Sequence, residues 1–135
     1  MSVNVFPTIA RGRVRDNATS FTIPGHPVGY YAQGKLPNWS RMKKYVEYKK
    51  KVQLEALCHG LILPLKATKD RPVSIKVVSY FKTGVHCDPG NVLKGIVDAL
   101  FYGGQGDKFT GGVFHWPLYD PVNPRAEVFV QELRN

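Results

Sequence analysis

The run of residues 86–101 constrains the fold of this chain more than any other stretch. Asp88-Pro89-Gly90-Asn91 is a typical β-turn sequence, but aspartate is also a good N-cap and proline suits the first position of a helix. The residues that follow have helical spacing, which favours the helix. The apolar side of this helix comprises Val92, Leu93, Ile96, Val97, Ala99 and Leu100, and its polar stripe comprises Asn91, Lys94 and Asp98. A helix with such a broad apolar side must lie mostly buried against other elements.

Several other segments have the patterns of strands. Residues 73–81 are rich in β-branched and aromatic side chains and predict a strong strand, and residues 20–23 predict a strand that ends at a Pro-Gly turn. Residues 113–116 and 126–133 are later strand candidates, with a proline-rich loop between them. Residues 1–17 have no sustained period and suggest a flexible basic arm or an edge strand. At 135 residues with 43% apolar composition, we expect one α+β domain with a small mixed sheet and two main helices.

The first of these helices is expected from Asn38 or Ser40 to Cys58. Its apolar stripe comprises Tyr45, Tyr48, Val52 and Ala56, and its basic residues are Arg41, Lys43, Lys44, Lys49, Lys50 and Lys51. Only Glu47 and Glu55 are available to pair with these cations inside the helix. We therefore favour a helix that contacts a phosphate backbone over a merely solvated helix face.

The charge balance points the same way. The chain has 19 Lys and Arg against 10 Asp and Glu, a formal net charge of +9 and a pI near 9.7, and such a surplus favours a polyanionic partner such as nucleic acid. A soluble basic protein without that partner is the alternative. Cys58 and Cys87 are too few for a disulfide framework or a paired zinc module, and we see no secretion signal or membrane span. We expect a cytoplasmic protein without a membrane partner.

The polar stripe of residues 91–98 has two interpretations. Lys94 and Asp98 are four residues apart and suit an ordinary ion pair on one helix. The same stripe resembles the signature of the RusA family of Holliday junction resolvases, in which two acidic residues precede asparagine, lysine and an Asp-Ala-Leu sequence. Asp88, Asn91, Lys94 and the run of residues 98–100 match those positions, and Asp107 lies near the family's final acidic position. Upstream, a strand ending in proline, a tyrosine-bearing loop and a basic helix also match, more weakly.

The resemblance implies a RusA-like fold and a magnesium-dependent endonuclease, with manganese as a substitute metal, that cleaves Holliday junctions or related branched DNA as a homodimer. It makes Asp88 and Asp107 the metal ligands and Lys94 the residue that stabilises charge on the phosphate. Asn91 and Asp98 are then supporting residues, and Asp98 orients either Lys94 or the helix. Two departures are visible: Gly90 replaces the second acidic residue, and Gly106 precedes Asp107 where a pair of aspartates is common. The alternative function is a non-catalytic DNA-binding protein of the same fold that lost turnover at Gly90. An RNA-binding protein unrelated to resolvases is a third hypothesis.

The remaining motifs of the sequence are less specific. Residues 103–108 are glycine-rich but lack the ending of a nucleotide-binding loop, and we expect a mobile loop that carries Asp107. His86 and Cys87 have no second His/Cys cluster at ligand spacing, so a structural role is favoured. The pair at 115–116, His-Trp, is typical of core aromatics on a strand. In the loop of residues 25–37, Tyr30 and Tyr31 either pack on the core or form a lip that stacks on nucleic acid.

Overall fold

The structure is a computed structural model that describes residues 14–32, 38–102 and 107–134, except for the side chains of residues 14–17, 107, 133 and 134. Residues 1–13 of the predicted basic arm, residues 33–37 of the tyrosine-bearing loop and residues 103–106 of the glycine-rich segment therefore lie outside the described residues. The elements follow in the order β1 (Val14–Pro24), α1 (Trp39–Cys58), β2 (Val73–Phe81), α2 (Pro89–Leu100), the 3-10 helix η1 (Asp107–Phe109), β3 (Thr110–Phe114), β4 (Leu118–Tyr119) and β5 (Arg125–Arg134).

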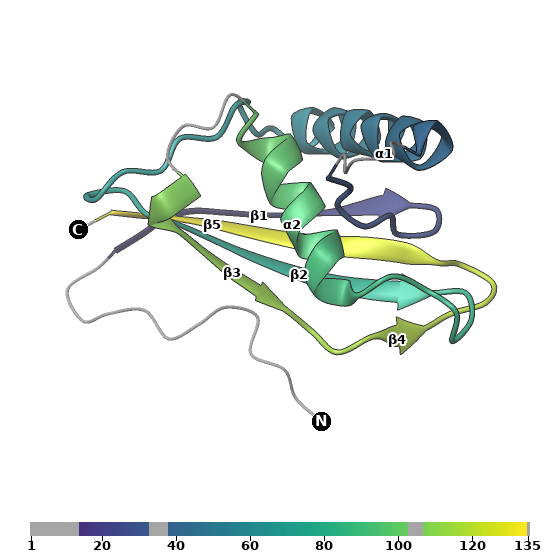
Figure 1. Cartoon of the computed structure of the whole chain (residues 1–135). Helices are drawn as coiled ribbons and strands as arrows, with labels where there is room; N and C mark the ends of the chain where they lie inside the picture. The colour runs from purple at the N-terminus through teal and green to yellow at the C-terminus, as the bar shows by residue number, and fades with distance from the viewer. Residues whose placement is uncertain (1–13, 33–37, 103–106, 135) are drawn as a thin grey trace.

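All described strands join one mixed sheet of five strands (Figure 1). The strand order is β1-β5-β2-β3, and β4 pairs with β2 beyond the end of β3. The β1–β5 and β5–β2 pairs are antiparallel, whereas β3 and β4 run parallel to β2. Parallel neighbours need a crossover connection, which α2 supplies between β2 and β3. The expected α+β architecture, with a small mixed sheet and two main helices, is confirmed.

The core lies between this sheet and the two helices, which cover the same face in Figure 1. Every residue of β2 except Tyr80 is buried, as expected for a central strand. From α2, Val92, Ile96 and Leu100 are fully buried in this core, while Asn91, Lys94 and Asp98 are exposed, so the predicted division of the helix into two sides is confirmed. The four residues of the predicted α1 stripe are likewise its buried residues.

Both helices begin where their caps predict. The Asn38 side chain accepts a hydrogen bond of 3.1 Å from the Arg41 backbone N–H, which satisfies a donor that the first turn of α1 leaves unpaired. Asp88 caps α2 in the same manner, with Pro89 as the first helical residue. The boundaries of these two helices were therefore predictable from local chemistry.

Three strand predictions need correction. β1 begins at Val14 rather than Ser20, because it pairs with β5 along its whole length despite its irregular polarity, with a register shift between Arg15 and Asn17. β3 ends at Phe114, so Trp116 lies beyond the strand. The proline-rich segment, expected to be a loop only, contains the two-residue strand β4.

Glycines explain why the start of β3 was missed. Gly111 and Gly112 have low strand propensity, yet they lie inside β3. A Cβ at position 112 would lie 3.1 Å from Leu93 Cδ2, so glycine allows α2 to pack close to this strand.

Among the described residues, Cys58 and Cys87 are both free, and no helix is long and apolar enough to cross a membrane.

Candidate nucleic-acid interface

The first turn of α2 holds Asp88 in a fixed position. Its Oδ1 accepts a hydrogen bond of 2.8 Å from the Gly90 N–H, and its backbone carbonyl accepts bonds from the N–H groups of Asn91 and Val92. The Asp88 side chain is exposed at the N-terminus of α2. Asp88 is therefore a fixed, solvent-accessible carboxylate whose capping bond orients one of its oxygens.

Lys94 and Asp98 do not form the ion pair that their spacing suggested. The Lys94 ammonium lies over the Tyr30 ring, 4.3 Å from its centroid, while Asp98 bonds to residues of α1. A lysine placed before an acid at this spacing is the less favourable order, so partners on other elements compete effectively. Of the two roles suggested for Asp98, these contacts give no support to orienting Lys94, whereas the bonds to α1 agree with orienting the helix.

Asp98 instead ties α2 to α1. Its Oδ2 accepts a hydrogen bond of 2.6 Å from the Tyr45 hydroxyl and one of 3.1 Å from the Lys49 ammonium. Partial burial alone would raise the pKa of the Asp98 carboxyl, but these two bonds and the charge of Lys49 hold that pKa below its usual range. Burial, together with the hydrogen bond to Asp98, raises the pKa of the Tyr45 hydroxyl well above its ordinary value.

Gly90 lies under the ring of Phe114. A Cβ at position 90 would lie 3.2 Å from Phe114 Cε1 and 3.3 Å from Asp88 Oδ1. A side chain here would meet an aromatic ring on one side and the Asp88 carboxylate on the other. The position at which the RusA signature has its second acidic residue is thus largely filled by Phe114.

The backbone does not bring Asp107 to Asp88. Asp107 begins η1, which leads into β3 at Thr110, whereas Asp88 lies close to Phe114 at the opposite end of β3. A strand of this length spans about 16 Å at ~3.3 Å per residue. The Asp107 side chain is outside the described residues, so a cation shared by the two aspartates stays a prediction, and the backbone positions do not support it.

The described residues do not offer a complete magnesium site. No group of three or more His, Cys, Asp or Glu side chains that could hold a metal ion is found among them. The side chain of Asp107, the second predicted ligand, lies outside the described residues. Magnesium in proteins is usually held by one or two carboxylates together with waters and substrate phosphates, so Asp88 is one candidate ligand and the magnesium site stays a prediction.

The cations of α1 surround the helix instead of lining one side. At ~100° per residue, Lys43 and Lys50 point directly away from the buried stripe, whereas Lys44 and Lys49 lie on opposite flanks. Lys49 is held by Asp98, and the Lys51 ammonium donates a hydrogen bond of 2.6 Å to the Pro24 carbonyl. Within the described residues, these two of the six predicted DNA-binding residues donate hydrogen bonds to other parts of the protein.

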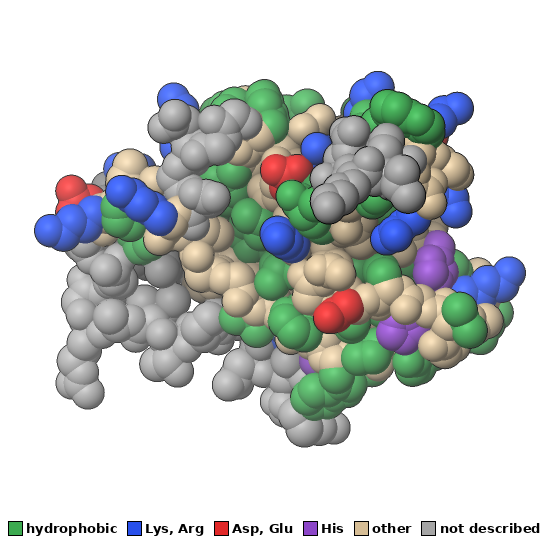
Figure 2. Space-filling view, in the orientation of Figure 1, with side chains coloured by type: hydrophobic (Ala, Val, Ile, Leu, Met, Phe, Trp, Pro, Cys, Tyr) green, Lys and Arg blue, Asp and Glu red, His purple; other side chains and the backbone are tan. Residues whose placement is uncertain are grey.

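Two other cations of α1, Arg41 and Lys44, and Lys94 of α2 lie at the tyrosine-bearing loop, a feature that sequence reasoning found only in part. The Arg41 guanidinium lies over the Tyr31 ring at 5.3 Å from its centroid, and Lys94 lies over Tyr30. Lys44 lines the same pocket as Arg41 and both tyrosines. We call this set the tyrosine–cation face: Tyr30, Tyr31, Arg41, Lys44 and Lys94. Figure 2 shows that most charged side chains on the side of the molecule that carries α2 are basic.

Both tyrosines are half-buried, so each ring packs against the protein and keeps part of its surface exposed. The Tyr30 N–H donates to the Asn91 carbonyl at 2.9 Å, and the Tyr30 ring packs edge-on against Tyr45. The Tyr31 hydroxyl accepts a hydrogen bond of 2.7 Å from the Asn38 N–H. The loop is therefore fixed to both helices while its rings hold cations.

The histidines have structural contacts. His86 stacks on Phe81 with a centroid distance of 3.9 Å and hydrogen-bonds to the Tyr119 hydroxyl, in agreement with the expected structural role. His115 is buried, but its neighbour Trp116 is 49% exposed, so the prediction of a core aromatic pair is wrong for the tryptophan. Trp116 is exposed because it lies past the end of β3, where no described strand pairs with it.

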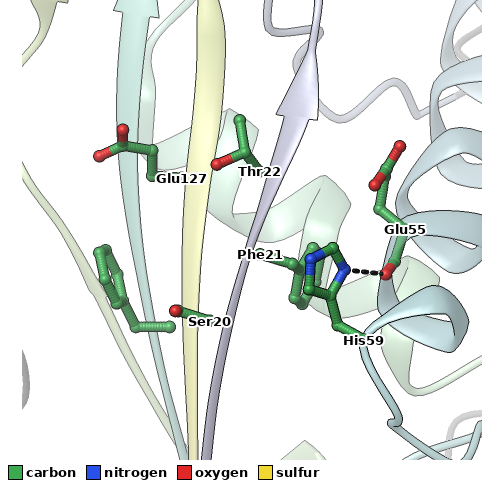
Figure 3. Close-up of a pocket in the computed structure, with 7 residues that line it drawn as sticks. Ser20, Phe21, Thr22, Glu55, His59 and Glu127 are labelled. Carbon is green, nitrogen blue, oxygen red and sulfur yellow. Dashed lines mark hydrogen bonds between the residues drawn. The ribbon is translucent and has the colours of Figure 1, made fainter.

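A larger pocket, of about 510 Å³, lies at the edge strand β1 and not at the tyrosine–cation face. Figure 3 shows Glu127 and Glu55 on opposite sides of β1, with Ser20, Thr22 and His59 between them. The two carboxylates make this pocket unsuitable for a phosphate. Arg41, Lys44 and Lys94, which suit an anion, lie instead where α1, α2 and the tyrosine-bearing loop meet.

Comparison with known proteins does not assign a family. No protein-family model matches the chain, and no curated protein matches it. The resemblance to the RusA signature therefore rests on the residues of this sequence alone.

Proposed function

We propose that this chain is a DNA-binding protein of the RusA type that binds branched DNA, such as a four-way junction, through the tyrosine–cation face. The observation that carries this proposal is the convergence of Arg41, Lys44 and Lys94 from two helices on a pair of adjacent tyrosines. In the part of the chain that the structure describes, none of the three forms an ion pair. Cations without internal carboxylate partners suit phosphate oxygens, and aromatic rings suit unstacked bases.

The salt dependence of binding tests this proposal. The triple variant Arg41→Gln/Lys44→Gln/Lys94→Gln removes three charges, and each lost phosphate contact lowers the slope of log K against log salt by ~0.9. Fluorescence anisotropy with a labelled four-way junction should show weaker binding and a slope flatter by up to about 3. An unchanged affinity and slope in the triple variant would show that this face does not contact DNA.

A second candidate is the endonuclease activity that the RusA resemblance implies. It is favoured by the exposure of Asp88, Asn91 and Lys94 on one side of α2. Magnesium, or manganese in its place, would supply a Lewis acid there, with Asp88 as one carboxylate ligand. The test is nicking of a labelled junction across a magnesium and a manganese titration, with Asp88→Asn as the variant. Nicking by the parent that is lost in Asp88→Asn would favour the endonuclease.

A homodimer is part of the same proposal. A four-way junction has twofold symmetry, and a protein with C2 symmetry presents the same surface to both halves. Light scattering of the protein with and without a junction should give a dimer mass on DNA. One protein copy per junction at saturation would contradict the dimer.

A further inference from the structure

A pocket of about 250 Å³ lies within the tyrosine–cation face and next to the start of α2. Its walls come from three elements: loop residues 26–31, Arg41 and Lys44 of α1, and the segment of Cys87 and Asn91. This volume is smaller than the ~300–1,000 Å³ of most cofactor and drug sites. A pocket of this volume suits one monomer unit of a polymer better than a whole cofactor.

The loop packs closely enough against α2 to form the floor of this pocket. A Cβ at Gly29 would lie 3.2 Å from Cys87 Sγ and 3.3 Å from Asn91 Cβ, so this position requires the close approach that glycine permits. The Tyr30 N–H bonded to the Asn91 carbonyl fixes the adjacent residue. Because Gly29 and Tyr30 both hold the loop against the start of α2, the pocket is preformed.

The lining of the pocket selects an anion that carries a flat group. Arg41 and Lys44 supply two cations, no acidic side chain lines the pocket, and the exposed Asn91 amide supplies further donors. The Tyr31 ring with the Arg41 guanidinium over it offers a surface on which a base stacks. A phosphate joined to a nucleoside matches both requirements.

We propose that this pocket binds the phosphate and the attached nucleoside of one unpaired nucleotide, at a branch point or at a single-stranded arm. A base within a duplex cannot enter a concave site without leaving its stack, whereas an unpaired nucleotide can. The assignment rests on the proposed DNA-binding function and adds a preference to it. The protein distinguishes DNA with unpaired nucleotides from fully paired DNA.

The experiment compares a labelled fork having two single-stranded arms with a duplex of equal phosphate count, by anisotropy at fixed salt. The pocket variant is Arg41→Gln/Lys44→Gln, and its matched control is Lys43→Gln/Lys50→Gln, which removes the same charge from the outer side of α1. The parent should prefer the fork. The pocket variant should lose at least tenfold more affinity for the fork than for the duplex, and the control should weaken both equally.

Two further arms examine the nucleoside. Tyr31→Leu removes the ring and should reduce fork affinity by roughly 5- to 100-fold, as expected for loss of one stacked base. Tyr31→Phe keeps the ring but removes the hydroxyl that accepts from Asn38, so it should lose less fork affinity than Tyr31→Leu. A deoxynucleoside monophosphate should compete with the fork better than inorganic phosphate at the same concentration.

The outcomes separate the pocket from the proposed function. A parent that binds fork and duplex equally well, or a pocket variant that weakens both by the same factor, overturns the pocket assignment and leaves DNA binding intact. Equal competition by inorganic phosphate and the monophosphate overturns the nucleoside part. A parent that binds neither DNA at low salt overturns the proposed function and the pocket together.

Discussion

At Gly95 in α2, an added Cβ would lie 3.0 Å from Tyr45 Cε1 and 3.4 Å from the Tyr30 backbone nitrogen. Tyr45 is buried, and its hydroxyl is bonded to Asp98, so its ring has little freedom to move aside. This glycine sets how closely α2 approaches both α1 and the tyrosine loop. At ~100° per residue Gly95 lies between the apolar and polar sides of α2, and this spacing alone does not show its closeness to the two tyrosines.

Gly95→Ala should therefore destabilise the protein. Alanine gains up to about 1 kcal/mol of helix propensity, but overpacking costs ~1–3 kcal/mol, and we expect a net loss of about 1 kcal/mol in the free energy of unfolding. Urea unfolding measures the difference. The control is Gly84→Ala, whose added Cβ would have no neighbour within 4 Å and should change stability little. Equal or higher stability of Gly95→Ala would show that the two helices can separate slightly without cost.

The same kind of crowding applies to Gly90→Asp, the change that restores the acidic residue of the RusA signature. Its Cβ would meet the Phe114 ring and the Asp88 carboxylate, so the new charge would be placed beside an apolar surface and a like charge. We expect lower thermal stability and no nicking of a junction in magnesium, alone or with Phe114→Ala to make room. Magnesium-dependent nicking by either variant would show that the missing acid alone limits catalysis.

At the scale of elements, the sequence predicted both helices and the central strand well, because caps, spacing and β-branched runs act locally. It failed where long-range packing decides: β3 contains two glycines because Leu93 packs against it, and Asp98 bonds to Tyr45, a residue of α1, rather than to Lys94 on its own helix. The candidate site follows the same division. The capping role of Asp88 and the place of Lys94 on the polar side of α2 were predictable, whereas the convergence of Arg41 and Lys94 on the tyrosines required the tertiary structure.

The contact between α1 and α2 should depend on pH through Asp98. The folded-state pKa of this carboxyl lies below its unfolded value of ~3.9, so its stabilising effect is present above that pH and is lost as pH falls through the folded pKa. Because the side chain is 46% exposed, solvent screening limits the effect to about 1 kcal/mol. Asp98→Asn should be less stable than the parent by that amount at neutral pH.

Urea unfolding at neutral pH and near pH 3 measures this dependence, and the difference between parent and Asp98→Asn should shrink at the lower pH. Asp70→Asn is the control, because Asp70 is an exposed loop carboxylate that forms no ion pair within the described residues. Its difference from the parent should stay small at both values. A constant difference for Asp98→Asn across this range would show that the charge of Asp98 does not stabilise the contact between the helices.

For the whole molecule, a formal charge of +9 on 135 residues means that the folded chain repels itself where no anion is bound. Salt screens this repulsion, with a Debye length of about 10 Å at 0.1 M. The thermal unfolding midpoint should therefore rise by a few degrees between low and moderate sodium chloride. Lys43→Gln/Lys50→Gln/Lys66→Gln, which lowers the charge from +9 to +6, should be more stable than the parent at low salt and should respond less to added salt.

DNA should stabilise the protein most at low salt, where the free protein is least stable. A ligand that binds only the folded state raises the midpoint by an amount that grows with the logarithm of its affinity, and phosphate contacts weaken as salt increases. At low salt a fork should raise the unfolding midpoint of the parent, and the triple variant Arg41→Gln/Lys44→Gln/Lys94→Gln should lose most of this rise. The variant at positions 43, 50 and 66 carries the same charge change and should keep more of it. If both variants lose the DNA-dependent rise equally, total charge governs binding, and the tyrosine–cation face has no special part in it.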